Sequence, residues 1–258
     1  MTPFELEALG GPWARRLAPK RAGWDDLPWA DAGQGASPEA TEHARWVWTQ
    51  SAFSEYASAA AFAEIASHLL AAAAPIDLVA AAGEFVSDEV LHAELSARVA
   101  MALGGAVSLD VDMTRLVRPP SGGAPLLRAA ELVVRTSCVG EALTVPILKS
   151  ARAACGSPLV ERVIARILAD ESVHAQLGGW FLDWADDRLS DADRGHLGEI
   201  ASAAVRDFAP VLGTGCGTAG LGVLDCARYD ATFAAAVAER VVRPLAARGI
   251  VVRGEVLD

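Results

Sequence analysis

Two eight-residue segments of the chain repeat one pattern of acidic and imidazole side chains. Residues 88–95 read DEVLHAEL and residues 170–177 read DESVHAQL, with five of the eight positions identical. Each segment contains Glu-x-x-His. On a helix, residues i and i+3 share a face, so the carboxylate and the imidazole can bind one metal ion together. A single such pair is typical of a structural hydrogen bond, but the repeat predicts a site for two metal ions.

Both pairs lie on apolar helix faces. The face of Glu89 and His92 continues through Leu78, Ala82, Phe85, Ser96 and Val99. The face of Glu171 and His174 continues through Val160, Ile164, Ile167 and Phe181. Burying four ionisable groups without compensating charge would cost several kcal/mol each, whereas two divalent cations would neutralise them.

A dimetal carboxylate site in a helical bundle needs one further Glu from each of the other two helices. In the third helix Glu141 lies on the apolar face, and Glu131 lies about 80° away from it at 100° per residue. In the first helix Glu55 lies on the more apolar face. Glu64, nine residues later, faces the opposite side, where we expect it to pair with His68 at the surface or at a helix contact.

Start and stop signals divide the chain into six helices. Ser37-Pro38-Glu39 predicts a helix start, and Gly104-Gly105 a helix end. The expected helices cover about 37–74, 76–103, 124–154, 158–187, 190–209 and 229–247, and residues 106–123 form a long crossover. Glu55 lies 19 residues before a turn near residue 74, and Glu141 lies 15 before a turn near 156. Each Glu–His pair begins 15 residues after its turn, so all six groups fall at matching levels.

The predicted fold is all-α, a four-helix bundle with a long crossover between its second and third helices. Residues 1–36 are expected to form an irregular N-terminal arm, residues 37–187 the bundle, and residues 188–258 a C-terminal extension of two helices packed on it. Pro146 removes the backbone hydrogen bond to Ala142. The third helix should therefore kink or widen one turn from Glu141.

The six-residue set resembles that of the ferritin-like diiron-carboxylate superfamily, over about residues 45–187. The phrases EYASAAAF, DEVLHAEL, SCVGEAL and ADESVHAQL are similar to those of bacterial ferritin-like-domain proteins. The resemblance implies two Fe ions, with Mn able to replace one or both. It also implies Glu55 and Glu141 as terminal ligands, Glu89 and Glu171 as bridging ligands, and His92 and His174 as the imidazole ligands of one ion each.

Three further residues are candidates for supporting roles. Asp88 and Asp170 could each orient the opposite motif's His through its free ring nitrogen. The alternative is that they are ordinary solvated acids. Thr144, three residues after Glu141, stands where bundle oxygenases often keep a hydroxyl near the O2 site. The alternative for Thr144 is a hydroxyl bonded to the backbone beside Pro146.

The function that the resemblance favours is O2-dependent oxidation of a small organic substrate. The chain has no electron-transfer motif, so an external reductase or ferredoxin would supply electrons. The alternative is iron oxidation, storage or detoxification, as in ferritins. Minimal ferritin subunits need neither the arm nor the C-terminal helices, and this favours the enzyme. The sequence leaves the oligomeric state open, a homodimer included.

Composition excludes several partners and compartments. The net charge is −11 with a pI near 4.9, and such a surface repels nucleic acid and anionic membranes. No signal peptide and no run of 18 apolar residues is found, so the expected location is cytoplasmic. Cys138, Cys155, Cys216 and Cys226 show no C-x-x-C spacing and are expected to be reduced. The bias towards Ala and Arg suggests a GC-rich bacterial gene.

Overall fold

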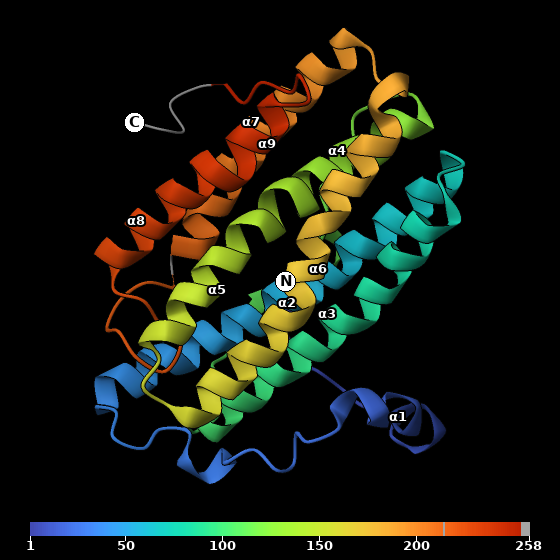
Figure 1. Ribbon diagram of the computed structural model, residues 1–258. Helices are drawn as coiled ribbons and strands as arrows, with labels where there is room; N and C mark the ends of the chain where they lie inside the picture. Colours follow the sequence, from blue (N-terminus) through green and yellow to red (C-terminus); the bar gives the residue numbers. More distant parts are fainter. Residues whose placement is uncertain (214, 254–258) are drawn as a thin grey trace.

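The computed structural model describes residues 1–213 and 215–253 (Figure 1). It is all-α, as the sequence predicts, and the only strands in the described residues are β1 (Thr2–Pro3) and β2 (Asp110–Val111), which pair antiparallel. Among the same residues, no helix combines the length and the apolar character needed to span a lipid bilayer.

The first helical hairpin consists of α2 (Pro38–Ala71) and α3 (Ile76–Ala102). The start of α2 follows the predicted signal, because the Ser37 hydroxyl accepts a hydrogen bond of 3.1 Å from the Ala40 backbone N–H. The chain leaves α3 through Gly104 and Gly105, both at positive φ, where glycine carries little strain. The two helices pack side by side along their length.

The second hairpin begins after the long connection, which contains β2 and a 3₁₀ turn at Met113–Arg115. Its first arm is one continuous helix made of α4 (Pro125–Val133), a π-helical segment (Val134–Glu141) and α5 (Ala142–Ala154). Its second arm is α6 (Pro158–Ala185), whose start is capped by the Ser157 hydroxyl. The second hairpin packs on the first through contacts of α4 with α2 and of α6 with α3 (Figure 1).

The predicted widening of the third helix is present, but it lies on the N-terminal side of Glu141. The wide turns run from Val134 to Glu141, and regular α-helix is restored before Pro146. Single π-turns are frequent at functional sites because they change the direction in which side chains leave the helix. Here the widened segment ends at Glu141, a predicted ligand.

The N-terminal arm and the C-terminal helices pack on these hairpins. The arm contains α1 (Gly11–Leu17) and 3₁₀ turns at Ala18–Arg21 and Trp29–Asp31, regular structure that its sequence did not predict. After a 3₁₀ turn at Asp186–Arg188 come α7 (Asp191–Gly213), α8 (Cys226–Ala236), a π-helical segment (Val237–Val242) and α9 (Arg243–Ala246). These C-terminal helices lie against the arm of the second hairpin formed by α4 and α5 (Figure 1).

The expectation of four reduced cysteines is wrong for one pair, because Cys216 and Cys226 form a disulfide. The chain folds back between them through hydrogen bonds from Gly217 N to Leu224 O (2.8 Å) and from Gly220 N to Val223 O (3.1 Å). This brings their Cα atoms to 4.9 Å, within the range of a disulfide. A spacing of ten residues in a Gly-rich loop carries no sequence signal for such a turn.

We therefore expect two thiols, Cys138 and Cys155, to react with a thiol reagent when the protein is denatured without reductant. Four should react after reduction. Four reactive thiols before reduction would show that the Cys216–Cys226 bond is absent in the protein as purified.

Candidate metal centre

The first hairpin contributes three of the six predicted ligands. Glu89 and His92, three residues apart on α3, are 0% and 1% exposed and face α2, where Glu55 is half-buried. One ligand atom from each of Glu55, Glu89, His92 and Glu171 can be chosen so that all four lie within 4.8 Å of one another. This separation is short enough for a shared metal ion.

The second hairpin contributes the other three. Glu171 and His174 on α6 are both fully buried, and Glu141 at the end of the π-helical segment is 5% exposed. The charges of Glu171 and Glu89 both act on the Glu141 carboxyl, which places Glu141 in the same cluster. The structure thus brings together all six residues.

The two imidazoles are arranged symmetrically about the two central carboxylates. His92 Nδ1 lies 3.1 Å from Glu171 Oε1 and 3.6 Å from Glu89 Oε2. His174 Nδ1 lies 2.9 Å from Glu89 Oε1 and 3.4 Å from Glu171 Oε2. In both cases the nearer carboxylate belongs to the other hairpin.

The same atoms show that the residues fit a metal. None of these short separations has the direction of a hydrogen bond, so the Nδ1 atoms of both His and all four oxygens of Glu89 and Glu171 are buried without a hydrogen-bond partner. Buried polar atoms are normally paired, so a cluster of unpaired oxygens and nitrogens is compatible with a metal-binding site. Carboxylate oxygens and imidazole nitrogens are a donor set for Fe, Mn or Zn.

Asp88 and Asp170 lie near the Nε2 atoms of the two His. Each Asp lies near the His of the other Glu-x-x-His motif. Asp170 Oδ2 is 3.1 Å from His92 Nε2, and Asp88 Oδ2 is 3.6 Å from His174 Nε2. The first separation is that of a hydrogen bond, whereas the second is longer and leaves His174 Nε2 without a hydrogen-bond partner. A carboxylate that bonds the outer nitrogen of a metal-binding His fixes the ring and directs the other nitrogen towards the metal. The aspartates are in turn paired with cations: Arg166 Nη1 is 2.6 Å from Asp170, and Lys20 Nζ is 2.7 Å from Asp88.

The buried glutamates and histidines of the cluster shift one another's pKa values. Burial raises the pKa of Glu55 and of Glu141, and neighbouring carboxylates raise each further. Burial would also raise the pKa of Glu171, but His174 and His92 outweigh it and lower that pKa. Burial acts to lower the pKa of His174, yet Asp88 and Glu171 raise it to about 11.

His92 behaves like His174. Burial opposes its charged form, and contacts with Asp170, Glu171 and Glu89 raise its pKa well above the usual value. Without a metal, these shifts favour the charged form of both imidazoles and the protonated form of Glu55 and Glu141. A divalent ion must displace these protons before it can bind.

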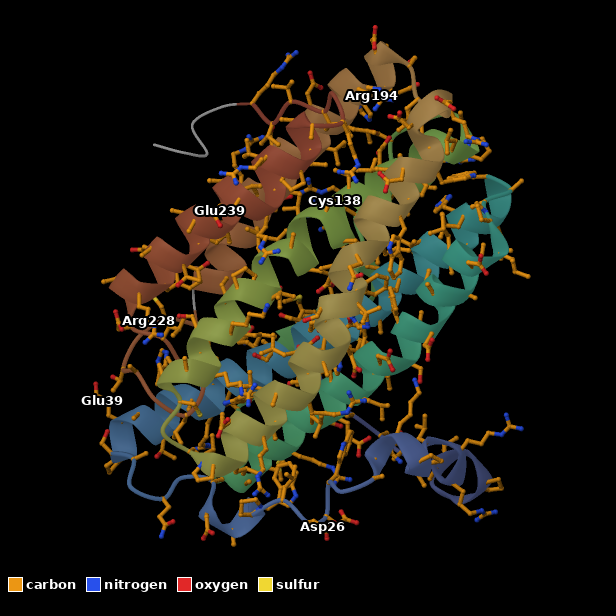
Figure 2. All side chains as sticks on the ribbon, viewed as in Figure 1. Asp26, Glu39, Cys138, Arg194, Arg228 and Glu239 are labelled. Atoms are coloured by element: carbon orange, nitrogen blue, oxygen red, sulfur yellow. A yellow bond between two sulfur atoms is a disulfide. The ribbon has the colours of Figure 1, made fainter. Side chains whose placement is uncertain are left out.

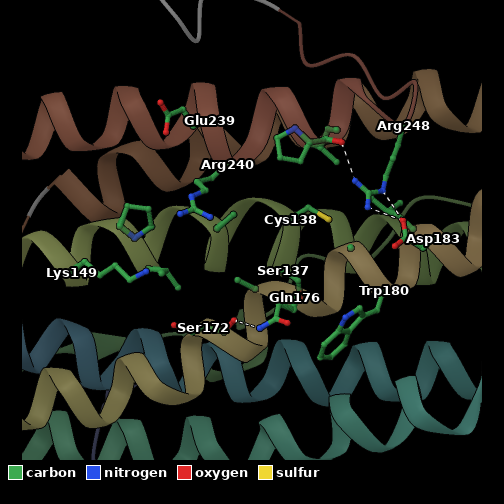
Figure 3. A pocket seen from close by; sticks show the side chains of 18 residues that line it. Ser137, Cys138, Lys149, Ser172, Gln176, Trp180, Asp183, Glu239, Arg240 and Arg248 are labelled. Carbon is green, nitrogen blue, oxygen red and sulfur yellow. Dashed lines mark hydrogen bonds and ion pairs between the residues drawn. The ribbon is translucent and has the colours of Figure 1, made fainter.

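A pocket of about 460 Å³ lies outside the bundle, between α5, α6 and the C-terminal helices (Figure 3). Lys149 and Arg240 line it and form no ion pair within the part of the chain that the structure describes, whereas Arg248 is paired with Asp183 at 2.7 Å. Ser137, one turn before Glu141, also lines the pocket, and its hydroxyl is buried without a partner. Cys138, the next residue, also lines the pocket and lies on the helix at the centre of Figure 2.

Three other residues considered in the sequence analysis, Glu64, Glu131 and Thr144, have different surroundings. Glu64 is exposed and lies 3.7 Å from His68 Nε2, on the side of α2 away from the site. Glu131 is buried, but it accepts hydrogen bonds from the Ser121 N–H and from Ser121 Oγ and lies 3.0 Å from His196 Nε2. Thr144 is half-buried, and its hydroxyl forms no hydrogen bond among the described residues, so the expected backbone-bonded alternative is not seen.

Sequence reasoning missed the two basic side chains that pair with Asp170 and Asp88. Arg166 stands four residues before Asp170 on one helix, so its position could have been found from the spacing. Lys20 is 68 residues from Asp88, and nothing in its local sequence indicates the contact.

In comparisons with known proteins, no family model, curated protein or solved structure matches the chain.

Proposed function

We propose that the chain is a ferritin-like diiron protein that oxidises a small organic substrate with O2. The observation that carries this proposal is the cluster of unpartnered, buried carboxylate oxygens and imidazole nitrogens between the two hairpins. Glu55 and Glu141 would each bind one ion, Glu89 and Glu171 both, and His92 and His174 one each. Four carboxylates would balance two Fe(II) ions, and Mn is a chemically similar alternative.

The bound ions would supply the electrons that reduce O2, and an external donor would restore them. The chain's own residues keep water away from this chemistry. Phe62 and Phe181 are fully buried, and the Phe85 ring centroid lies 4.2 Å from that of His174. Apolar walls of this kind strengthen the electrostatic interactions inside them.

The pocket beside α5 and α6 is the place that we propose for the substrate. Its residues Ser172 and Ala175 directly follow the ligands Glu171 and His174, and Ala142 follows Glu141. A cavity of this size suits a small molecule. The two unpaired cations at its edge favour a substrate that carries an anionic group.

Anaerobic titration with Fe(II) tests the metal centre. We expect two ions per chain in the wild type and a clear loss in Glu55→Ala, because a ligand is removed. Glu64→Ala is the matched control: it removes a Glu from the same helix, but from the exposed side, and should leave the metal content unchanged. One ion or fewer in the wild type, or loss of metal in Glu64→Ala alone, would overturn the assignment.

Aerobic loading separates this proposal from iron storage. Phe62 and Phe85 pack against His174, with ring centroids 5.4 and 4.2 Å from its own, and leave no room there for a mineral. Uptake should therefore stop near two ions per chain, with O2 consumed in one burst unless substrate and donor are present. Uptake of hundreds of ions per assembly would instead assign the protein to iron storage.

A further inference from the structure

The N-terminal arm places one charged side chain beside the metal centre. Lys20 Nζ lies 2.7 Å from Asp88 Oδ1, and the other oxygen of Asp88 lies 3.6 Å from His174 Nε2. Lys20 therefore contacts a group that itself contacts a predicted ligand. The side chains become more buried along this line, from 35% exposed at Lys20 through 12% at Asp88 to 0% at His174.

The other half of the centre has the same chain of contacts but takes its cation from the bundle itself. Arg166 lies on α6, one turn before Asp170, and Asp170 contacts His92. Thus the cation beside the His92–Asp170 pair comes from α6, within the two hairpins. The cation beside Asp88 and His174 comes from the N-terminal arm, outside the hairpins. The two metal positions are inequivalent for this reason, although their ligands match.

The arm has other contacts that hold it on α3. Arg21 donates to Glu94 through Nε at 2.9 Å and through Nη2, and Trp24, 4% exposed, lies with its ring 5.4 Å from the Arg98 guanidinium. Neither contact includes Lys20 or Asp88. Neutralising Lys20 should therefore leave the arm in place, and neutralising Arg21 removes one arm contact while the Lys20–Asp88 pair and the Trp24–Arg98 contact remain.

We propose that Lys20 is a positioning residue for the metal ion bound by His174. Its ammonium group holds Asp88 Oδ1 and keeps Oδ2 3.6 Å from His174 Nε2. A small approach of the two groups on metal binding would let Oδ2 accept the Nε2–H and leave the Nδ1 lone pair for the metal. This inference rests on the proposed dimetal function. It adds that the arm controls the occupancy of one of the two positions.

Titration with Co(II) under anaerobic conditions, followed by visible absorption and metal analysis, tests the role of Lys20. In Lys20→Met one of the two ions should bind about 10- to 100-fold more weakly, the range found when such supporting contacts are removed. Lys20→Arg should restore the affinity, because a guanidinium can also donate to Asp88. Arg21→Met should bind both ions as the wild type does.

A double-mutant cycle separates the contact from a general effect on the arm. In an Asp88→Asn background, Lys20→Met should cause no further loss, because its partner carboxylate is gone. Equal weakening by Lys20→Met and Arg21→Met, or two ions bound with unchanged affinity in Lys20→Met, would overturn this inference alone. A wild-type protein that binds fewer than two ions would instead overturn the proposed function.

Discussion

Metal-free Glu141→Gln protein should unfold at a higher temperature than metal-free wild type at pH 7.5. Burial, together with the charges of Glu171 and Glu89, raises the pKa of Glu141 in the folded state. Above its ordinary pKa the folded chain therefore binds a proton that the unfolded chain releases, and stability falls as the pH rises towards the raised value. An amide keeps the shape of the protonated acid and removes this cost.

We expect a gain of about 1–4 kcal/mol, the size found when buried charges are replaced by neutral groups. For a chain of this length, each kcal/mol raises the midpoint by roughly 2–4 °C. With two metal ions bound the sign should reverse, because the amide introduced by Glu141→Gln is a weaker ligand than the carboxylate. In the proposed centre, the Glu141 carboxylate would thus stabilise the metal-bound fold and destabilise the metal-free fold.

Thermal melts in the presence of a chelator and in excess Co(II) would show both signs. Glu64→Gln is the control, because that side chain is exposed, and should change neither melt. Near pH 4 the gain of Glu141→Gln should disappear, since the acid is then protonated in both states. A lower midpoint for Glu141→Gln in chelator would show that the anion of Glu141 stabilises the fold.

Metal loading near pH 7 should release more than two and up to four protons per chain. Two come from His92 and His174, whose raised pKa values keep them charged until a metal binds. The others come from Glu55 and Glu141, to the extent that burial keeps these acids protonated. Affinity should therefore increase about tenfold per pH unit for each proton released.

Calorimetric titration in buffers of different ionisation enthalpy counts these protons. Glu55→Gln should release fewer than the wild type, because one titrating acid is removed. Release of no protons at pH 7 would show that the imidazoles are neutral before the metal arrives. In the metal-free protein, the raised pKa of each His also implies stability that is fully present below about pH 6.5 and is lost as the pH rises through the folded value.

The helices and the clustering of the predicted ligand residues could be predicted because both depend on local periodicity. Ser37 and Ser157 cap the helices that their sequences indicate, and α3 ends one residue before the expected position. The choice of Glu55 over Glu64 needed only the helical phase of an apolar face. The two near-identical motifs indicated the positions of Glu89, His92, Glu171 and His174 in the same way.

Contacts between distant segments could not be predicted. The Lys20–Asp88 pair, the Cys216–Cys226 disulfide and the pocket formed with the C-terminal helices depend on how separate elements pack, for which a single sequence carries no periodic signal. The π-helical turns were expected from Pro146, but their position before Glu141 depends on packing against α6 and α7.

The contacts between His of one hairpin and carboxylates of the other have a consequence for how the chain folds. Each imidazole has its nearer carboxylate and its supporting aspartate on the opposite hairpin, so neither hairpin carries a finished site. The six donors converge only after the connection between α3 and α4 has closed and the hairpins have docked. In the proposed dimetal protein, metal binding would therefore follow the docking of the two hairpins, and bound ions would link one hairpin to the other.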